Sequence, residues 1–299
     1  MDRPDAARIS AFEPLRRRLF GIAYRMLGSA EDAEDLVQET YLRWHESDAS
    51  RVESSEAWLV SVITRLAIDR ARRAAIERAH YVGHWLPEPV ATDERLGAER
   101  KLEEGDELSI AFLLLLERLS AHERAAFVLR EVFDYDYPLI SGAVEKTEAA
   151  TRQMVHRARE RLSLNAAKRP EKVASGALVQ RFLAALAHGD QQGILEVLSP
   201  DVRLISDSGG KVAAARNVIV GPERIARFFL GVRNKYTFAR EHEPLEQNGA
   251  AGWISVHAGR VLASTVVESN GDHITALFRV LNPDKLKTVA VGLSSAIAL

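Results

Sequence analysis

An arginine-rich stretch at residues 147–162 constrains the fold of this chain more than any other segment. Thr147 is a residue type favoured at helix N-caps, and Glu148 suits the positive end of the helix dipole. One set of residues then recurs at helical spacing and predicts a buried stripe, while another predicts a basic face. The first set is Thr151, Val155, Ala158 and Leu162, and the second is Arg152, His156 and Arg159, with Arg157 and Arg161 beside it. The stretch is therefore predicted to form a basic amphipathic helix.

Two shorter helices are predicted before this basic helix. Residues 121–132 carry apolar residues at helical spacing, and a short helix is expected around 139–144. Two short helices, a turn and a basic helix are typical of a helix-turn-helix, whose second helix enters the DNA major groove. A solvated arginine-rich helix is the simpler alternative, because runs of charge usually have no further role. The capped, amphipathic, two-helix context favours DNA binding.

The charges of the chain are nearly balanced in number but uneven in position. There are 40 Lys and Arg against 42 Asp and Glu, for a formal net charge of -2. Positive charge clusters at 65–78 and again at 152–169, and acidic charge at 31–39 and 93–107. Because overall attraction supplies most non-specific affinity for DNA, we expect weak DNA binding by this chain alone and a contribution from a partner.

Length and composition narrow the class of protein. A chain of 299 residues suggests two or three domains. The absence of cysteine excludes disulfides and thiol chemistry and is compatible with a reducing cytoplasm. No apolar run is long enough to cross a bilayer, and the polar N-terminus shows no signal-peptide pattern, so we expect a cytoplasmic protein without a membrane partner. No metal-ligand cluster, cofactor motif or nucleophile motif is recognisable, so we assign no metal site, no cofactor and no catalytic residues.

Four segments follow one another along the chain. Helices are predicted through the first segment, where Ser29 and Asp32 form a capping box and a second helix spans about 56–73. The next segment reads as a linker, because two prolines within 85–89 bar a regular helix. The last segment changes from helices to strand-like runs, which favours a small α+β domain with antiparallel strands. Its helices are predicted at 176–188, 190–198 and 222–233, and its strands at 202–206, 261–268 and 273–281.

This order of helical block, linker and helix-turn-helix resembles the bacterial sigma factors of the extracytoplasmic-function type. Residues 32–40 resemble the polymerase-binding helix of that family, and residues 57–73 resemble its promoter-opening region. The linker sequence Trp-Leu-Pro-Glu-Pro at 85–89 resembles a signature of the sigma-J-like subgroup, which carries a SnoaL-like domain at the C-terminus. Residues 207–211 and 282–286 resemble two further motifs of that subgroup.

The resemblance implies a multidomain chain with two all-α sigma domains and an α+β SnoaL-like cone domain. The first sigma domain is expected at 8–80, and the second, which contains the helix-turn-helix, at 108–168. The linker 81–107 joins them, and the SnoaL-like domain follows at 175–299. The sequence departs from the family at two positions. Ser208 stands where the family has glycine, and Glu145 stands where the turn of the helix-turn-helix usually has glycine.

The resemblance also implies partners and site residues for the two sigma domains. Core RNA polymerase would bind an acidic face, which without the family match would read as a solvated surface. Promoter DNA would bind arginines of the promoter-opening region and N-terminal residues of the basic helix. Trp44 and Trp58 fit a core position better than direct base contact. The polymerase-binding candidates are Asp32, Asp35, Gln38 and Glu39, and the DNA-binding candidates are Arg65, Arg72, Arg73, Thr151, Arg152, His156, Arg157 and Arg159.

The C-terminal domain is expected to control the sigma module within the same chain, through the linker and the two subgroup motifs. The residues implied are Trp85, Leu86, Pro87, Asp207, Gly209, Gly210, Lys211, Asn282, Pro283, Asp284 and Lys285. The chain is thus interpreted as a factor that directs core polymerase to promoters and is not an enzyme. Two alternatives stay open: a polymerase-independent regulator whose C-terminal pocket senses a ligand, and a SnoaL-type enzyme tethered to DNA. Titratable candidates for such an enzyme are Asp207, Lys211, His257 and His273.

Overall fold

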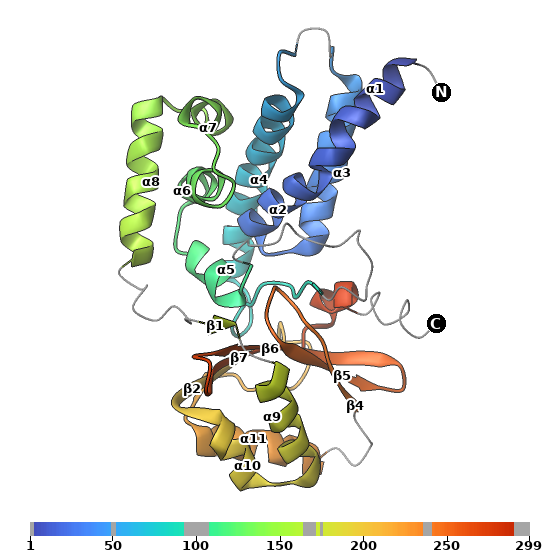
Figure 1. The fold of residues 1–299 in the computed structure, drawn as a ribbon, viewed down its shortest axis with the longest axis vertical. Coiled ribbons are helices and arrows are strands. Elements are labelled where there is room, and N and C mark those ends of the chain that lie inside the picture. Colours follow the sequence, from blue (N-terminus) through green and yellow to red (C-terminus); the bar gives the residue numbers. More distant parts are fainter. Residues whose placement is uncertain are drawn as a thin grey trace. The chain divides into compact units, whose positions relative to one another are not determined.

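The structure is a computed structural model, and it describes residues 3–48, 52–92, 108–163, 172–173, 176–235 and 241–289. Contacts divide the chain into two compact units. The helical unit comprises residues 1–80 and 100–167, and the sheet unit comprises residues 81–99 and 168–299 (Figure 1). The helix-turn-helix segment thus belongs to one unit with the N-terminal helices, and the linker belongs to the unit that contains the sheet. In the described part of the chain, no helix has both the length and the apolar character needed to span a membrane.

In the first half of the helical unit, helices α3 and α4 each begin at a serine N-cap. Ser29 accepts a hydrogen bond from the Asp32 backbone amide at 3.2 Å, and Ser54 does the same for Ala57. The Asp32 carboxylate pairs with Arg70 at 2.8 Å, so its partner is another helix and not the cap. The second predicted helix begins one residue early and continues six residues beyond position 73. The elements are α1 (Arg3–Phe12), a 3-10 turn (Glu13–Leu15), α2 (Arg16–Leu27), α3 (Ala30–Glu46) and α4 (Ser55–Ala79).

The second half of the helical unit contains the predicted helix-turn-helix. Thr147 caps the basic helix, since its Oγ1 accepts from the Ala150 amide at 3.2 Å. The predicted buried stripe of that helix is confirmed: Thr151, Val155 and Ala158 are fully buried. Glu145 in the preceding turn has a φ of 54°, the left-handed conformation that favours glycine. The elements are α5 (Ile110–Leu116), α6 (Ala121–Phe127), a π-helical turn (Val128–Val132), α7 (Tyr137–Val144) and α8 (Glu148–Ser163).

The sheet unit is an α+β fold in which three helices cover one face of a mixed sheet (Figure 1). The strand order is β3-β2-β7-β6-β5-β4, and β1 pairs with β6. The expectation of antiparallel strands is wrong for one pair, because β2 and β7 run parallel. The helices are α9 (Gly176–His188), α10 (Gln191–Val197) and α11 (Pro222–Lys235). The strands are β1 (Lys172–Val173), β2 (Leu198–Asp207), β3 (Ile219–Val220), β4 (Glu241–Pro244), β5 (Gly252–His257), β6 (Arg260–Ser269) and β7 (Ile274–Val280), followed by a 3-10 turn (Pro283–Lys285).

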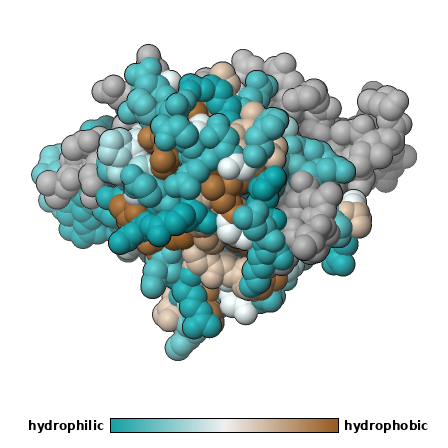
Figure 2. Space-filling model, turned by 90° about the horizontal axis from the view of Figure 1, so that it is seen from below, coloured by the Kyte–Doolittle hydropathy of each residue, from teal (hydrophilic) through white to brown (hydrophobic). Residues whose placement is uncertain are grey.

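The core of the sheet unit lies between the sheet and these helices. Phe182 of α9, Phe229 of α11 and Trp253 of β5 are buried there and contact one another. The face of the molecule seen from below is mainly hydrophilic, with apolar residues in small groups (Figure 2). The apolar residues of α9 and α11 therefore point into the unit, as their helical spacing predicts.

Candidate functional site: two arginine faces and a docked linker

The basic helix α8 presents arginine and histidine side chains at the surface. The Arg152 guanidinium lies over the ring of Tyr137 at 4.3 Å and pairs with Glu148 at 2.8 Å. His156 and Arg157 are exposed on the same helix, and His156 Nδ1 lies 3.6 Å from the Glu160 carboxylate. Sequence analysis missed Tyr137, whose stacking on Arg152 holds the guanidinium against α7. Three of the predicted DNA-binding residues, Arg152, His156 and Arg157, are therefore at the surface.

Other candidates on α8 have partners within the protein. Thr151 has no exposed surface, and its hydroxyl donates to the Thr147 carbonyl at 3.0 Å, so it cannot contact a base edge in this conformation. Thr151 belongs to the buried stripe of α8, so its side chain is not available for contact with DNA in this conformation. Arg159 pairs with Glu131 at 2.6 Å, and this hydrogen bond raises the pKa of the Arg159 guanidinium. Arg161 pairs with Glu123 at 2.8 Å. These two arginines tie α8 to the preceding helices of the domain.

The predicted promoter-opening arginines lie on α4, and two of them contact the helix-turn-helix segment. Arg65 donates to the Gly142 carbonyl at 2.8 Å and lies 3.2 Å from the Glu145 carboxylate. Arg72 Nη2 lies 3.3 Å from Nδ1 of His122 on α6. Arg73 is exposed. Two of the three DNA-binding candidates on α4 are therefore engaged with protein groups.

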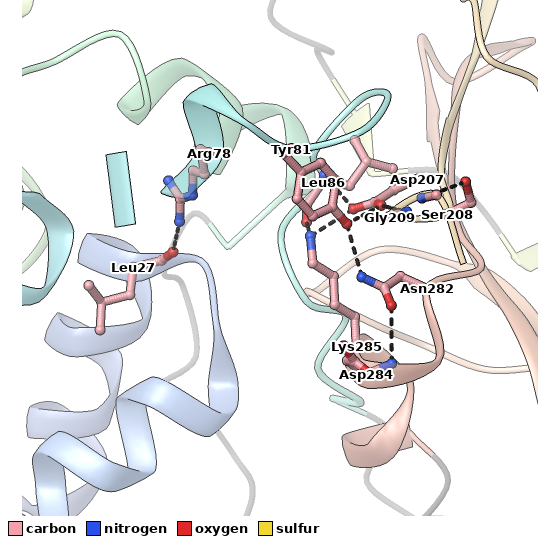
Figure 3. A network of polar contacts seen from close by, with 11 residues as sticks. Leu27, Arg78, Tyr81, Leu86, Asp207, Ser208, Gly209, Asn282, Asp284 and Lys285 are labelled. Carbon is pink, nitrogen blue, oxygen red and sulfur yellow. Dashed lines mark hydrogen bonds and ion pairs between the residues drawn. The ribbon is translucent and has the colours of Figure 1, made fainter. Parts of the chain in front are cut away.

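An ion cluster around the buried Arg124 joins the same two segments of the helical unit. Arg124 of α6 is 5% exposed, donates to the Met26 carbonyl at 2.7 Å and pairs with Glu117 at 2.7 Å. Arg78 of α4 also pairs with Glu117 and donates to the Leu27 carbonyl, as Figure 3 shows for Leu27. Burial lowers the pKa of the Arg78 guanidinium, and the adjacent Glu117 carboxylate opposes this shift. The last carbonyls of α2, which lack helical partners, are thus satisfied by two arginines.

The acidic candidates for polymerase binding lie on α3. Asp35 and Gln38 are exposed, and Glu39 is half-exposed and pairs with Arg43 one turn later at 2.6 Å. Asp32 differs because its carboxylate is engaged by Arg70. Sequence spacing placed all four on one outer face, but it could not show that α4 brings an arginine to the first of them.

The two tryptophans of this region pack against each other. Trp44 is 2% exposed, its ring centroid lies 5.2 Å from that of Trp58, and its Nε1 donates to the Arg8 carbonyl at 3.2 Å. The core interpretation is confirmed for Trp44.

The linker segment 81–92 is extended and packs onto the sheet unit, with Asp207 at the centre of the contact (Figure 3). Asp207 has no exposed surface. Its carboxylate accepts from the Tyr81 hydroxyl at 2.5 Å, from the Leu86 amide at 2.8 Å and from the Lys285 ammonium at 2.7 Å. Burial and this hydrogen bond to Asp207 raise the pKa of Tyr81, which keeps the phenol protonated as a donor. One buried carboxylate thus fixes both the start and the middle of the linker.

Lys285 and Asn282 complete this site from the motif near the chain end. The Lys285 ammonium donates to the Leu86 carbonyl at 2.6 Å and lies 4.4 Å from the centroid of the Trp85 ring. Asn282 Nδ2 donates to the Tyr81 hydroxyl oxygen at 3.0 Å. Lys211 pairs with Asp284 at the surface beside it. The three segments that the sequence singled out, at 85–89, 207–211 and 282–286, therefore meet in one place.

The glycines of the 207–211 turn are needed for this close approach. Gly209 has a φ of 56°, and a Cβ at this position would lie 2.6 Å from Asn282 Nδ2. Gly210 has a φ of 73°, and its Cβ would meet Val82 at 3.1 Å. Ser208, the departure from the family, accepts from the Gly210 amide at 3.4 Å and does not need the left-handed conformation. The substitution is thus compatible with the turn.

The second half of the linker adds backbone pairing that the sequence did not indicate. Val90 and Asn248 exchange two hydrogen bonds: the Val90 amide donates to Asn248 Oδ1 at 3.0 Å, and the Asn248 amide donates to the Val90 carbonyl at 2.8 Å. The Glu88 side chain is buried and accepts from the Thr288 hydroxyl at 3.2 Å. Leu86, Val90 and Ala91 are also buried. Residues 81–92 are therefore an integral part of the sheet unit; residues 93–107 of the predicted linker lie outside the described residues.

The titratable candidates for catalysis do not form one site. Asp207 is occupied by the linker, and Lys211 pairs with Asp284. His257 ends β5 and is paired in register with Arg260, whereas His273 lies in the turn between β6 and β7. The arrangement of these four residues supplies no acid–base pair facing a common space.

Comparisons with known proteins agree with this architecture. Residues 11–76 match the Sigma-70 region 2 model, and residues 109–162 match the Sigma-70, region 4 model. The chain is 35% identical over 289 residues to the ECF RNA polymerase sigma factor SigJ of Mycobacterium tuberculosis, covering 93% of this chain and 92% of the relative. It is 31% identical to the probable ECF RNA polymerase sigma factor SigI of the same organism, covering 72% of this chain and 73% of that one. The crystal structure of M. tuberculosis SigJ matches with a TM-score of 0.74 at 31% identity, covering 94% of this chain and 98% of that one. Two sigma domains followed by an α+β domain, over nearly the full length of such a relative, show that the chain belongs to the extracytoplasmic-function family of RNA polymerase sigma factors.

Proposed function

We propose that this sigma factor, which directs RNA polymerase to promoters, is regulated in cis by docking of its linker on the C-terminal domain. The observation that carries the proposal is the Asp207 carboxylate, which is fully buried and holds Tyr81, Leu86 and Lys285 together. The Lys285 side chain is 14% exposed, but the Asp207 carboxylate that it pairs with is fully buried, and a buried charge is costly without its partner. The linker connects the two sigma domains, so fixing residues 81–92 limits the arrangements that the two domains can adopt.

The DNA-binding roles on α8 follow from exposure. N-terminal residues of a recognition helix reach base edges in this docking geometry, and Arg152 and His156 are exposed there. Arg157 lies beside them and is assigned to phosphate, which positions the helix without reading sequence. Arg159 needs release from Glu131 before it can bind phosphate.

In this proposal, the arginines of α4 bind DNA only after the helical unit rearranges. Arg65 and Arg72 contact α7 and α6, so they bind DNA when the helix-turn-helix segment moves off α4. Core polymerase would bind the exposed acidic residues Asp35, Gln38 and Glu39 of α3 and drive that separation. Dependence on polymerase also fits the net charge of -2, which gives little general attraction to DNA. The site of action would then be the cytoplasm, and the chain would carry out no catalysis of its own.

Transcription in vitro tests the proposal. Core polymerase and the upstream region of this gene would be combined with the full chain or with chains ending near 169 and near 280. Transcripts from any of them identify an active sigma factor, and the ratio of yields gives the sign of C-terminal control. Silence from all three, with no binding to core polymerase, would favour a polymerase-independent regulator.

Point variants test the docked linker directly. Tyr81→Phe removes one hydrogen bond to Asp207, and Lys285→Met removes the ammonium that pairs with it. We expect each to change transcript yield in the same direction as removal of the C-terminal domain, by about 3- to 10-fold. Lys211→Met, which breaks only the exposed pair with Asp284, is the matched control and should change yield little. Equal effects of Lys285→Met and Lys211→Met would contradict control through Asp207.

A further inference from the structure

Tyr137, the first residue of α7, contacts the side chain of Arg152 on α8. The two helices pack against each other within the helical unit (Figure 1). The Arg152 guanidinium carbon lies 4.3 Å from the centroid of the Tyr137 ring, inside the distance of about 6 Å over which a cation and a ring attract each other. Arg152 is one of the exposed residues near the start of α8 to which the proposed function assigns base reading. Tyr137 is therefore the aromatic contact of a candidate base-reading residue.

The start of α7 fixes the position of the Tyr137 ring. Asp136 caps the helix, since its carboxylate accepts a hydrogen bond at 3.0 Å from a backbone amide of the first turn. Pro138 follows directly, in the first turn, where its fixed φ suits a helix. A second guanidinium, that of Arg130, lies 5.4 Å from the centroid of the same ring. The ring that Arg152 contacts is thus attached to a capped helix start and has a further cation beside it.

The two contacts of Arg152 differ in what they demand of its N–H donors. The ion pair with Glu148 takes one donor, Nη2, at 2.8 Å, and among the described residues it is the one hydrogen bond that this side chain donates. The contact with Tyr137 is an attraction between charge and ring and takes no donor. A bidentate contact to a base edge needs two guanidinium donors. Base reading therefore competes with the ion pair to Glu148 but is compatible with the contact to Tyr137.

A guanidinium that is already held loses less freedom when it binds a base. Ordering a long side chain at an interface costs free energy, and a restraint in the free protein reduces that cost. The benefit arises only where Arg152 forms its ordered contact, on an element that presents the matching base. On a scrambled element Arg152 has no such contact, so the restraint contributes nothing there.

We propose that Tyr137 is a positioning residue for promoter recognition: it holds the Arg152 guanidinium for the base edge and thereby raises discrimination of the upstream element. This inference rests on the base-reading role proposed for Arg152. The ring carries the positioning role, because the Tyr137 hydroxyl makes no hydrogen bond within the part of the chain that the structure describes. A structural role, in which Tyr137 only joins α7 to α8, is the alternative, and its loss would weaken binding to every sequence alike.

Two substitutions of Tyr137 separate the ring from the hydroxyl. Core polymerase with the full chain would be bound, in competition, to promoter fragments whose upstream element is intact or scrambled. Tyr137→Leu removes the ring, so the ratio of the two affinities should fall about 3- to 5-fold, through weaker binding of the intact element. Tyr137→Phe keeps the ring and should retain the parent ratio. Equal loss in both variants, or equal weakening of both fragments by Tyr137→Leu, would overturn the positioning role.

A double-mutant cycle shows whether Tyr137 acts through Arg152. In a chain that carries Arg152→Ala, Tyr137→Leu should leave the affinity ratio unchanged, because no guanidinium is left to hold. A further loss in the double variant would place the role of Tyr137 elsewhere and overturn the inference. If Arg152→Ala itself left the ratio unchanged, the proposed base reading by Arg152 would fail, and the positioning role with it. If Arg152→Ala lowered the ratio and Tyr137→Leu did not, the positioning role alone would fail.

Discussion

The arginines of α4 and α8 are similarly exposed, but their partners differ. The side chains of Arg65, Arg72 and Arg152 are 49%, 56% and 55% exposed. Arg65 and Arg72 reach across to α7 and α6, whereas Arg152 contacts Glu148 of its own helix and the neighbouring Tyr137. The exposed fraction of an arginine side chain therefore does not tell whether that side chain contacts another helix. Under the proposed function, α8 binds DNA in this conformation, whereas the arginines of α4 must first exchange their contacts with α6 and α7.

The exposed contacts of Arg65 and Arg72 contribute little to the stability of the packing between α4 and the helix-turn-helix segment. Exposed ion pairs such as Arg65 with Glu145 contribute about 0–1 kcal/mol each. Arg124 is buried and joins α6 to the end of α2 through Met26 and Glu117. Removing one partner from a buried charge cluster usually costs several kcal/mol. The contact of α4 with α6 is therefore stabilised mainly by the ion cluster around Arg124.

Replacement of the buried arginine should have the largest effect. Arg124→Met leaves Glu117 with Arg78 alone and a carbonyl of α2 without its donor, so we expect a loss of about 3 kcal/mol in the free energy of unfolding. Urea denaturation of the full chain measures it. Arg43→Met, which breaks an exposed pair on α3, is the control and should cost less than about 1 kcal/mol. Equal losses would show that Arg124 does not hold the two segments together.

Substitution of Arg152 on α8 should have the next largest effect, on promoter discrimination. Arg152→Ala should reduce discrimination between a matched and a scrambled upstream promoter element by about 10-fold, because a bidentate contact to a base edge is lost. Arg157→Ala should weaken binding to both elements alike, as expected for a phosphate contact. Competition binding with the polymerase complex measures both. If Arg152→Ala weakened the two elements equally, Arg152 would be a phosphate contact as well.

Substitution of Glu145, in the turn before α8, should have a smaller effect on the free energy of unfolding. Glu145 adopts a φ of 54°, where a side chain is strained, so Glu145→Gly should raise the free energy of unfolding by about 0.5–1 kcal/mol. Glu145→Gln keeps the strain and removes only the charge that faces Arg65, so it should lower stability slightly. Thermal unfolding of the two variants separates the backbone cost from the ion pair. A destabilised glycine variant would mean that the ion pair outweighs the strain.

The sequence predicted the helices that depend on local spacing and capping. It did not predict the contacts and strand pairings that depend on residues far apart in the chain. The spacing of Val155, Ala158 and Leu162 was sufficient to predict α8, and the expected helix at 176–188 has the bounds of α9. Two prolines showed that 85–89 is not helical, but burial of Leu86 depends on Asp207 and Lys285, more than a hundred residues away. Only the family resemblance brought these motifs together before the structure did. The parallel pairing of β2 with β7 and the partners of Arg65 and Asp32 depend in the same way on tertiary packing, which periodicity does not encode.

The smallest effect concerns pH at the contact between α4 and α6. Burial lowers the pKa of His122, and the nearby positive charges of Arg72 and Lys146 lower it further, against the opposing carboxylates of Asp69 and Glu145. The unfolded chain therefore binds a proton at His122 before the folded chain does. Stability is complete above the unfolded value of about 6.5 and falls as the pH drops below it. Since Arg124 and not His122 dominates the contact, we expect the slope to be shallow. The free energy of unfolding of His122→Gln and of the parent chain would be measured between pH 7.5 and 5, and the variant should lose this slope with pH. An unchanged slope would assign the pH dependence to other groups.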